Sequence, residues 1–544
     1  MSGTLLPLLV AVPLLVGGLL VALPDRLLLG RLLLLGTTGG STAAGVALVV
    51  SQLDGGVVAH RIGLWPAGIA IPFAADMLTA LMLTVTGLLT TVCALFAIAS
   101  GEAARRFFPP LVVVLTAGVN GALLTGDLFN LFVFIEVMLL PSYALLVMAA
   151  PRRGTTSRVA GARLYVTVNL LTSTIFLAGV GLLYGVTGSV NMADVAGAAQ
   201  TDGRAAVAAA VCLLALSIKA AVVPVHGWLA RAYPAASPAV TAMFSGLHTK
   251  VAIYAIYRIY AVVFGGDERW LWVGVLLFSA TMVVGVLGAV GEGTTRSILA
   301  FHMVSQIGYI LLGVALFGPL GLAAGIFYLL HHMIVKASLF LSTGAVEVRY
   351  GTHPLGAVRG IARTEPLVAV AFFAAALSLA GIPPFSGFVA KFSLVQAAVA
   401  EGQVAAAVVA VAVSLFTLLS MLKIWSAMFW GEPAAPGADP GGGGESSGPA
   451  LGGAAGARGA APTAVATRTG EQTTTETDPQ PASTTTATAR PGRRIGLALA
   501  LPGVVLAVVT LGLGLGGQLL MSLAQVAAEG LLDPTPYLEA VTSS

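Results

Sequence analysis

Apolar segments long enough to cross a lipid bilayer follow one another along almost the whole chain. The hydrocarbon core of a bilayer is about 30 Å thick, so that a spanning helix needs about 20 predominantly apolar residues. Hydrophobic residues make up 57% of the chain and charged residues 9%, whereas soluble domains average about 45–50% and 25%. The sequence therefore predicts an all-α polytopic membrane protein. We count fourteen segments, at residues 5–23, 27–50, 72–99, 109–125, 127–149, 161–185, 205–229, 238–262, 270–291, 295–317, 320–343, 366–397, 403–430 and 495–526.

The distribution of arginine supports this count, because basic residues accumulate in cytoplasmic loops. Loops after even-numbered segments contain only Arg61, Arg204 and Arg269. Loops after odd-numbered segments contain Arg26, Arg31, Arg105, Arg106, Arg152, Arg153, Arg158, Arg163, Arg231, Arg296, Arg349, Arg359 and Arg363. The alternation predicts that both chain ends lie outside the cytoplasm. The first segment lacks the preceding basic residues of a secretory signal, and we expect it to remain as a helix. The net charge of +4 is then explained by the basic residues of the cytoplasmic loops, and it indicates no nucleic-acid partner.

The composition changes abruptly once, at residues 431–493, which are rich in Gly, Pro, Ala, Ser and Thr. Such a segment cannot bury a core, and it predicts a disordered cytoplasmic linker. The predicted organisation is therefore three N-terminal helices at 1–108, two five-helix repeats at 109–265 and 266–430, this linker, and a last helix with a tail at 494–544.

All the lysines fall inside predicted helices, whereas we assign the arginines to loops. A lysine at mid-membrane costs about 2.5–3.5 kcal/mol on insertion scales and usually marks an ion or proton path. The five are Lys219, Lys250, Lys336, Lys391 and Lys423. For Lys423, which lies beside the aromatic residues at 425–430, snorkelling to the membrane surface is an equal alternative.

A carboxylate near a buried lysine would favour its charged form, which burial alone disfavours. Carboxylates are scarce in the apolar segments, and Glu136 lies roughly midway along one of them. A movable Glu136 could therefore load and unload a lysine proton. Asp127, nine residues earlier, is better explained as a helix N-cap.

Two segments contain helix breaks. Pro224 follows Lys219 by five residues, and Pro383 and Pro384 precede Lys391. Proline removes a backbone hydrogen bond, which lipid cannot replace, so a break is tolerated where it lines a polar cavity. Interrupted helices at matching positions in two halves are typical of transporter sites built on inverted repeats. The breaks in helices 7 and 12 thus predict two repeats, helices 4–8 and 9–13, and an odd number of helices in each repeat would require the repeats to be inverted.

The remaining candidate residues each have a structural alternative. The histidines in or beside helices suit a proton relay, although a histidine at such a position is more often a packing residue with a hydrogen bond; they are His226, His248, His302, His331 and His332. His332 and Lys336 are four residues apart and share a helix face. No spacing assembles three or four metal ligands, and Cys93 and Cys212 are expected to be core residues. The G-x-G-x-x-G match at 512–517 lies in an apolar helix and favours close packing over a dinucleotide cofactor.

With these residues identified, the chain resembles the antiporter-like membrane subunits of respiratory complex I, membrane-bound hydrogenases and multisubunit Mrp-type sodium/proton antiporters. The resemblance covers about residues 70–430 and includes the motifs GDLFNLFVFIEVMLLPSY, SIKAAVVPVHGWL, HHMIVKASLFLSTGAV and LAGIPPFSGFVAKF. The first of these motifs is most similar to that of the Mrp-type antiporters.

The resemblance implies a fold of fourteen helices with two inverted five-helix repeats. It also implies a pair between Glu136 and Lys219. A polar axis would continue from this pair through Lys250 and the region of His332 and Lys336 to Lys391. The resemblance further implies that the subunit works only within a hetero-oligomer of membrane subunits. We expect no cofactor.

Three functions follow as hypotheses. The first is a proton-translocating subunit, and not an enzyme, of a sodium/proton antiporter in the cell membrane. Here the partners are protons, sodium, the lipid bilayer and companion subunits. The second is a pumping subunit of a redox complex, in which electron transfer in the partners drives the same axis. The third, a membrane scaffold that transports nothing, would have no need for lysines at both helix breaks.

Overall fold

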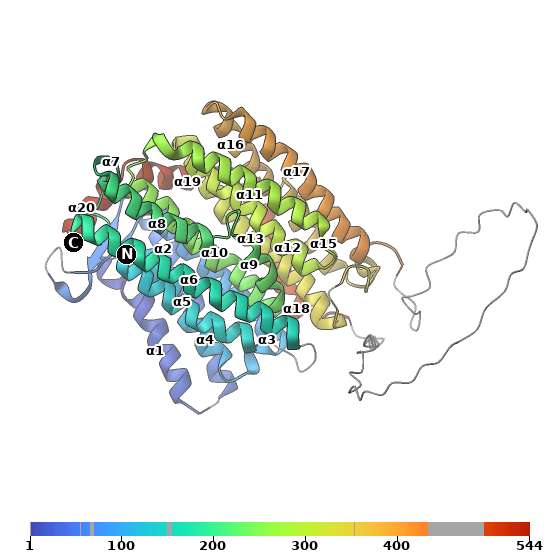
Figure 1. Cartoon of the computed structure of the whole chain (residues 1–544). Helices are drawn as coiled ribbons and strands as arrows, with labels where there is room; N and C mark the ends of the chain where they lie inside the picture. Colours follow the sequence, from blue (N-terminus) through green and yellow to red (C-terminus); the bar gives the residue numbers. More distant parts are fainter. Residues whose placement is uncertain are drawn as a thin grey trace, which may run out of the picture. The chain divides into compact units, whose positions relative to one another are not determined.

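The computed structural model describes residues 2–24, 26–54, 56–65, 70–148, 155–352, 354–432 and 494–543. These residues are almost wholly helical (Figure 1). The predicted linker at 431–493 lies outside the described residues, apart from its first two positions. The described part confirms the predicted class of a helical, multi-pass membrane fold.

Each predicted apolar segment contains one helix or two. Eleven helices in the described part are long and apolar enough to cross a membrane, and α4, α15 and α16 are shorter apolar helices. Fourteen crossings and the two repeats stay predictions. The main helices are α1 (Leu8–Ala22), α2 (Leu27–Ser51), α3 (Met77–Ser100), α4 (Phe108–Leu124), α5 (Leu128–Met148), α6 (Thr155–Thr187), α8 (Gly203–Lys219), α10 (Pro238–Val262), α11 (Leu271–Gly291), α12 (Thr295–Ala315), α13 (Pro319–Tyr350), α15 (Pro366–Ala380), α16 (Ser386–Ala400), α17 (Val404–Ile424), α18 (Leu497–Leu515) and α19 (Gly517–Leu532).

Shorter elements join these helices. They are α7 (Ala198–Thr201), α9 (Gly227–Ala232), α14 (Ile361–Thr364), α20 (Thr535–Ser543), the strands β1 (Val58–Arg61) and β2 (Pro72–Ala75), a π-helical turn at Trp425–Phe429, and 3-10 turns at Gly3–Leu5, Ile62–Leu64, Glu102–Ala104, Tyr233–Ala235 and Glu268–Trp270.

Two of the predicted segments differ in detail from the structure. Residues 72–75 form β2, and the helix begins only at Met77, because Asp76 accepts a hydrogen bond from the Thr79 backbone N–H (3.0 Å) and acts as its N-cap. The last segment divides into α18 and α19 at Gly516. Glycine is a poor helix former, and hydropathy averaged over a window does not register this interruption.

A two-stranded hairpin brings the chain ends together. Strands β1 and β2 pair antiparallel, with Val58 opposite Ala75 and Arg61 opposite Pro72. The 3-10 turn at the N-terminus packs against β1, and α20 near the C-terminus packs against both strands. Figure 1 shows both termini at this same end of the helices. An even number of membrane crossings requires this arrangement.

The helices α10 and α13 form the interior of the protein. Helix α10 and the central part of α13, from Gly321 to Val346, are completely buried, yet these two helices have the lowest mean hydropathy of the eleven long apolar helices of the described part. Helix α13 packs against α3, α10, α12, α15, α16, α18 and α19. Polar side chains on these two helices therefore face other protein groups, whereas the outer helices expose their apolar side chains.

Both broken helices are interrupted beside a proline. Helix α8 ends at Lys219 and α9 begins at Gly227, with Pro224 between them. Backbone groups beside this break hydrogen-bond to side chains. Trp228 Nε1 donates to the Ile218 carbonyl (2.9 Å), and the Val223 N–H donates to Thr281 Oγ1 (3.1 Å). The second break runs from Gly381, in the left-handed region at φ 88°, to the start of α16.

Helix α18 packs tightly against the second break through Gly514. A Cβ at this position would lie 2.2 Å from the Pro384 carbonyl oxygen, whereas a Cβ at Gly512 would meet nothing within 4 Å. We expect Gly514→Ala to destabilise the protein by about 1–3 kcal/mol through overpacking. Gly512→Ala should leave stability unchanged or raise it slightly, because alanine favours the helix. The midpoint of thermal unfolding in detergent measures both variants, and equal midpoints would contradict the close packing.

Candidate functional site

Four lysine side chains are buried in the protein interior. Lys250 and Lys336 are fully inaccessible, Lys219 is 3% exposed and Lys391 is 7% exposed. In the described part of the chain, none of these four ammonium groups forms an ion pair with a carboxylate. Such groups are expensive to bury without neutralisation or hydrogen bonds. The uncharged groups that accept hydrogen bonds from these lysines are therefore part of the candidate site.

Lys219, the last residue of α8, is held by an amide. Its Nζ donates to Asn169 Oδ1 (3.2 Å) on α6, and Asn169 Nδ2 donates in turn to the Tyr165 carbonyl (2.8 Å). Glu136 on α5 interacts electrostatically with Lys219. No ion pair joins these two side chains, both of which the structure describes, and Glu136 Oε1 is buried without a hydrogen-bond partner. The two residues are thus near one another but not in contact.

The centre of the site comprises Lys250 on α10 and His332 and Lys336 on α13. Lys250 Nζ donates to Thr249 Oγ1 (3.0 Å), and Lys336 Nζ donates to the Leu299 carbonyl of α12 (2.9 Å). His332 interacts electrostatically with both lysines, and neither of its ring nitrogens has a hydrogen-bond partner among the residues that the structure describes. The charges of two lysines from different helices therefore both act on this histidine.

Lys391 lies at the second break. Its Nζ donates to the Ala380 carbonyl (3.1 Å), the last of α15, and lies 5.1 Å from the centre of the Tyr309 ring. His331, on α13, shares a hydrogen bond with Ser386 Oγ (2.8 Å), the first residue of α16. The two helix ends at the break thus supply the Ala380 carbonyl to Lys391 and the Ser386 hydroxyl to His331.

The other candidate histidines have hydroxyl partners or lie at a break. His248 shares a short hydrogen bond with the Tyr165 hydroxyl, and His302 Nε2 shares one with Ser420 Oγ (2.5 Å). His226 is half-buried at the N-cap of α9, with its Nδ1 unpaired. These contacts fit the packing alternative for His248 and His302 as well as a role in proton transfer.

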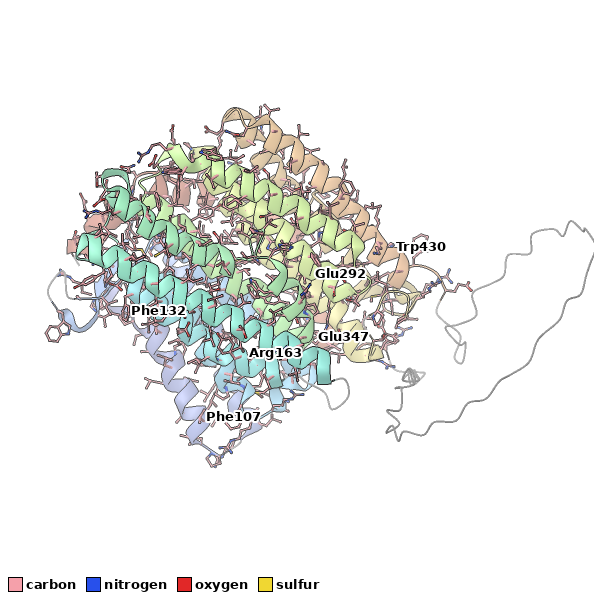
Figure 2. The ribbon with its side chains drawn as sticks, in the orientation of Figure 1. Phe107, Phe132, Arg163, Glu292, Glu347 and Trp430 are labelled. Atoms are coloured by element: carbon pink, nitrogen blue, oxygen red, sulfur yellow. The ribbon has the colours of Figure 1, made fainter. Side chains whose placement is uncertain are left out.

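Lys423 and Asp127 both cap helix ends, so that each of them has a structural role. Lys423 Nζ donates to the Val290 and Glu292 carbonyls (2.8 and 2.7 Å) and so caps the C-terminal end of α11; Figure 2 labels Glu292. Asp127 Oδ1 accepts a hydrogen bond from the Asn130 N–H (2.6 Å) and caps α5. Both residues therefore lie outside the series of four buried lysines.

Sequence reasoning missed Asn169, the partner of Lys219. A single amide in an otherwise apolar segment was the available signal, because asparagine is costly in a membrane unless it is paired. Tyr165 is another polar residue of this segment with buried polar partners: its hydroxyl contacts both His248 and Ser142.

The assignment of arginines to loops is wrong for Arg258, which lies in the interior of α10. Its Nη2 forms an ion pair with Asp76 Oδ2 (2.7 Å), and the side chains are 1% and 7% exposed. The guanidinium also lies 4.4 Å from the centre of the Tyr537 ring of α20. The sequence signal was a charge within segment 238–262 together with an acidic residue near the start of segment 72–99.

Within the described residues, no group of three or more His, Cys, Asp or Glu side chains is arranged to hold a metal ion. The candidate groups are lysines, histidines and one glutamate, and the helices that contain most of them are α5, α8, α10, α12, α13 and α16. Side chains of these types can accept and release protons.

Comparison with known proteins agrees with this architecture. A family model described as NADH:quinone oxidoreductase/Mrp antiporter, TM, matches residues 125–417. The D subunit of the Na(+)/H(+) antiporter of Alkalihalophilus pseudofirmus is 39% identical over 434 residues, which are 79% of this chain and 87% of the relative. This relative is named as part of an antiporter, which is a transporter and not an enzyme.

Solved structures give the same result. A chain in the structure of the Mrp complex from Dietzia sp. has 59% identity and a TM-score of 0.88, with 99% of each chain covered. A chain of respiratory complex I from Thermus thermophilus with bound NADH has 22% identity and a TM-score of 0.73, over 97% of this chain and 99% of that chain. The second likeness concerns the fold alone. With a family model that matches more than half of its length and relatives that match most of it, the chain belongs to the NADH:quinone oxidoreductase/Mrp antiporter family of transmembrane proteins.

Proposed function

We propose that this chain is the proton-translocating D-type subunit of a multisubunit sodium/proton antiporter in the cell membrane. The named function of the relative from Alkalihalophilus pseudofirmus and the similarity to a chain of an Mrp complex support the proposal. Companion membrane subunits, protons and sodium are its partners.

One observation supports proton transfer most directly: each of the four buried lysines donates to a neutral oxygen. The acceptors are an amide, a hydroxyl and two backbone carbonyls. A neutral amine also donates hydrogen bonds, so these contacts can persist whether or not the lysine carries the proton. An adjacent carboxylate would instead favour the charged form. The lysines are therefore suited to gain and lose protons while they keep these hydrogen bonds.

Lys219 and its two neighbours form the proposed gate. With Glu136 withdrawn and Asn169 as the acceptor, as in this arrangement, the lysine can release its proton. Approach of the Glu136 carboxylate stabilises the ammonium form and reloads it. Asn169 thus holds the side chain in place while the charge changes.

From Lys219 the proton passes along the polar axis to Lys250, then to the region of His332 and Lys336, and finally to Lys391. The ring of His332, whose nitrogens have no hydrogen-bond partner among the described residues, provides a proton acceptor in this region. Buried polar groups of this kind usually bind internal water, which would complete the hydrogen-bonded path. Lys391, at the second break, is the far end of the axis.

A redox-driven pump is the second candidate, because the fold is shared with a chain of respiratory complex I. In that case the same lysines would respond to electron transfer in partner subunits. A scaffold function is disfavoured, because four buried lysines that form no ion pair with any described residue weaken a structure that only has to pack.

The companions of the chain distinguish these functions. We expect the native assembly, extracted in mild detergent and isolated through this subunit, to contain only other membrane subunits and to exchange sodium for protons in reconstituted vesicles. Proteins with iron–sulfur or flavin groups among the companions, or proton uptake that is independent of sodium, would replace the antiporter proposal with the redox-driven pump.

A further inference from the structure

A pocket lined by three arginines lies where two connecting turns meet. Arg26 belongs to the turn between α1 and α2, and Arg105 and Arg106 belong to the turn between α3 and α4. Leucine and proline side chains, including Leu20, Leu27 and Pro109, form the apolar wall. We propose that this pocket binds the headgroup of an anionic phospholipid, with its acyl chains along the adjoining helices.

The three arginines are available for a ligand. All three are exposed, and none forms an ion pair with the described part of the chain. Glu102 interacts electrostatically with Arg105 without forming an ion pair with it, and its carboxylate accepts a hydrogen bond from Ser237 Oγ (2.5 Å). Asp25, in the same turn as Arg26, lies outside the described residues.

The pocket lies at the level where the apolar helices end. Helix α1 ends at Ala22 and α3 at Ser100, whereas α2 begins at Leu27 and α4 at Phe108. These four ends come from helices that pack against one another. An apolar helix ends at the boundary of the hydrocarbon core, so the arginines lie at the depth of lipid phosphates.

Exposed apolar residues continue from the pocket along the helices. Leu28 is 70% exposed, and Phe107, which Figure 2 labels near the ends of the blue helices, is 49% exposed. The Arg106 guanidinium lies 5.4 Å from the centre of the Phe107 ring. Acyl chains can therefore contact apolar surface directly beside the charged groups.

The chemistry favours an anionic lipid over a zwitterionic one. Guanidinium groups bind phosphate oxygens in a bidentate manner, and in phosphatidylcholine the cationic choline would oppose the three arginines. The sequence places these arginines on the cytoplasmic side, where anionic lipids concentrate in many membranes; each basic residue near such a surface strengthens the attraction about fivefold. This site is separate from the buried lysines and does not depend on the transport function.

Lipid titration of the intact assembly tests the proposal. Native mass spectrometry with added phosphatidylglycerol should show a bound lipid whose dissociation constant rises about 100-fold in the triple variant Arg26→Gln, Arg105→Gln, Arg106→Gln. Phosphatidylcholine should bind weakly and equally to both proteins. The control variant Arg231→Gln, Arg359→Gln, Arg363→Gln removes the same charge from exposed positions elsewhere and should bind phosphatidylglycerol normally.

Three results would overturn the proposal. Unchanged phosphatidylglycerol binding by the first triple variant would exclude the pocket, and equal weakening in both triple variants would indicate a general effect of charge. Competition by millimolar inorganic phosphate, with no added effect of acyl chains, would assign the pocket to free phosphate. The midpoint of thermal unfolding in phosphatidylcholine checks that the variants remain folded.

Discussion

Replacement of Lys219 by alanine is expected to reduce sodium/proton exchange about 100-fold or more, because a positioned group that transfers a proton typically contributes about 10²–10⁴-fold to a rate. The assembly should still form, since Lys219 makes a single side-chain hydrogen bond, to Asn169. Dissipation of an imposed pH gradient on addition of sodium, in vesicles containing the reconstituted assembly, measures the rate.

Lys423 provides the matched control for this substitution. It is also a lysine in an apolar helix, but it caps α11 through two backbone carbonyls. Lys423→Ala should therefore exchange ions within about twofold of the original rate, given that helix-end charges typically contribute about 0.3–1 kcal/mol to stability. Normal exchange by Lys219→Ala, or an equal loss in both variants, would refute the proposed gate.

Replacement of Arg258 by methionine is expected to destabilise the fold by about 3–5 kcal/mol, because it leaves the buried Asp76 carboxylate without its cation. Asp76 is 5% exposed and also caps α3, so that it cannot turn towards water without loss of the cap. The midpoint of thermal unfolding in detergent should fall by several degrees.

A second substitution separates the loss of the pair from the loss of packing. Asp76→Asn combined with Arg258→Met removes both charges and keeps a residue suitable for the N-cap, and the double variant should recover much of the lost stability. Arg269→Gln, which breaks the exposed pair with Asp267, should leave the midpoint unchanged. A double variant as unstable as Arg258→Met would mean that the guanidinium acts mainly through packing on Tyr537.

The helical architecture could be predicted from the sequence because a bilayer imposes one length scale and one polarity on every spanning helix. The apolar segments, the burial of the four lysines and the helix ends beside Pro224 and Pro384 all follow from local composition. The hairpin of β1 and β2 could not, because it depends on pairing between two four-residue strands in connecting segments.

The neighbours of each functional side chain could not be predicted either. Hydropathy places Lys219 in a helix, but only the packing of α6 against α8 brings Asn169 to it. In the same way, Arg258 meets Asp76 because α10 packs against α3. Partners of this kind depend on which helix faces meet, and a single sequence contains no direct record of those contacts.

The polar interior also constrains how the protein is made. Helix α10 contains Lys250 and Arg258, and each such charge costs about 2.5–3.5 kcal/mol at the centre of an inserting helix. We therefore expect α10 to enter the bilayer stably only together with α3, which supplies Asp76. Its neighbour α13 is synthesised more than fifty residues later. Until then α10 has an unshielded polar face, so that a ribosome stalled between these helices should leave a product sensitive to membrane quality-control proteases.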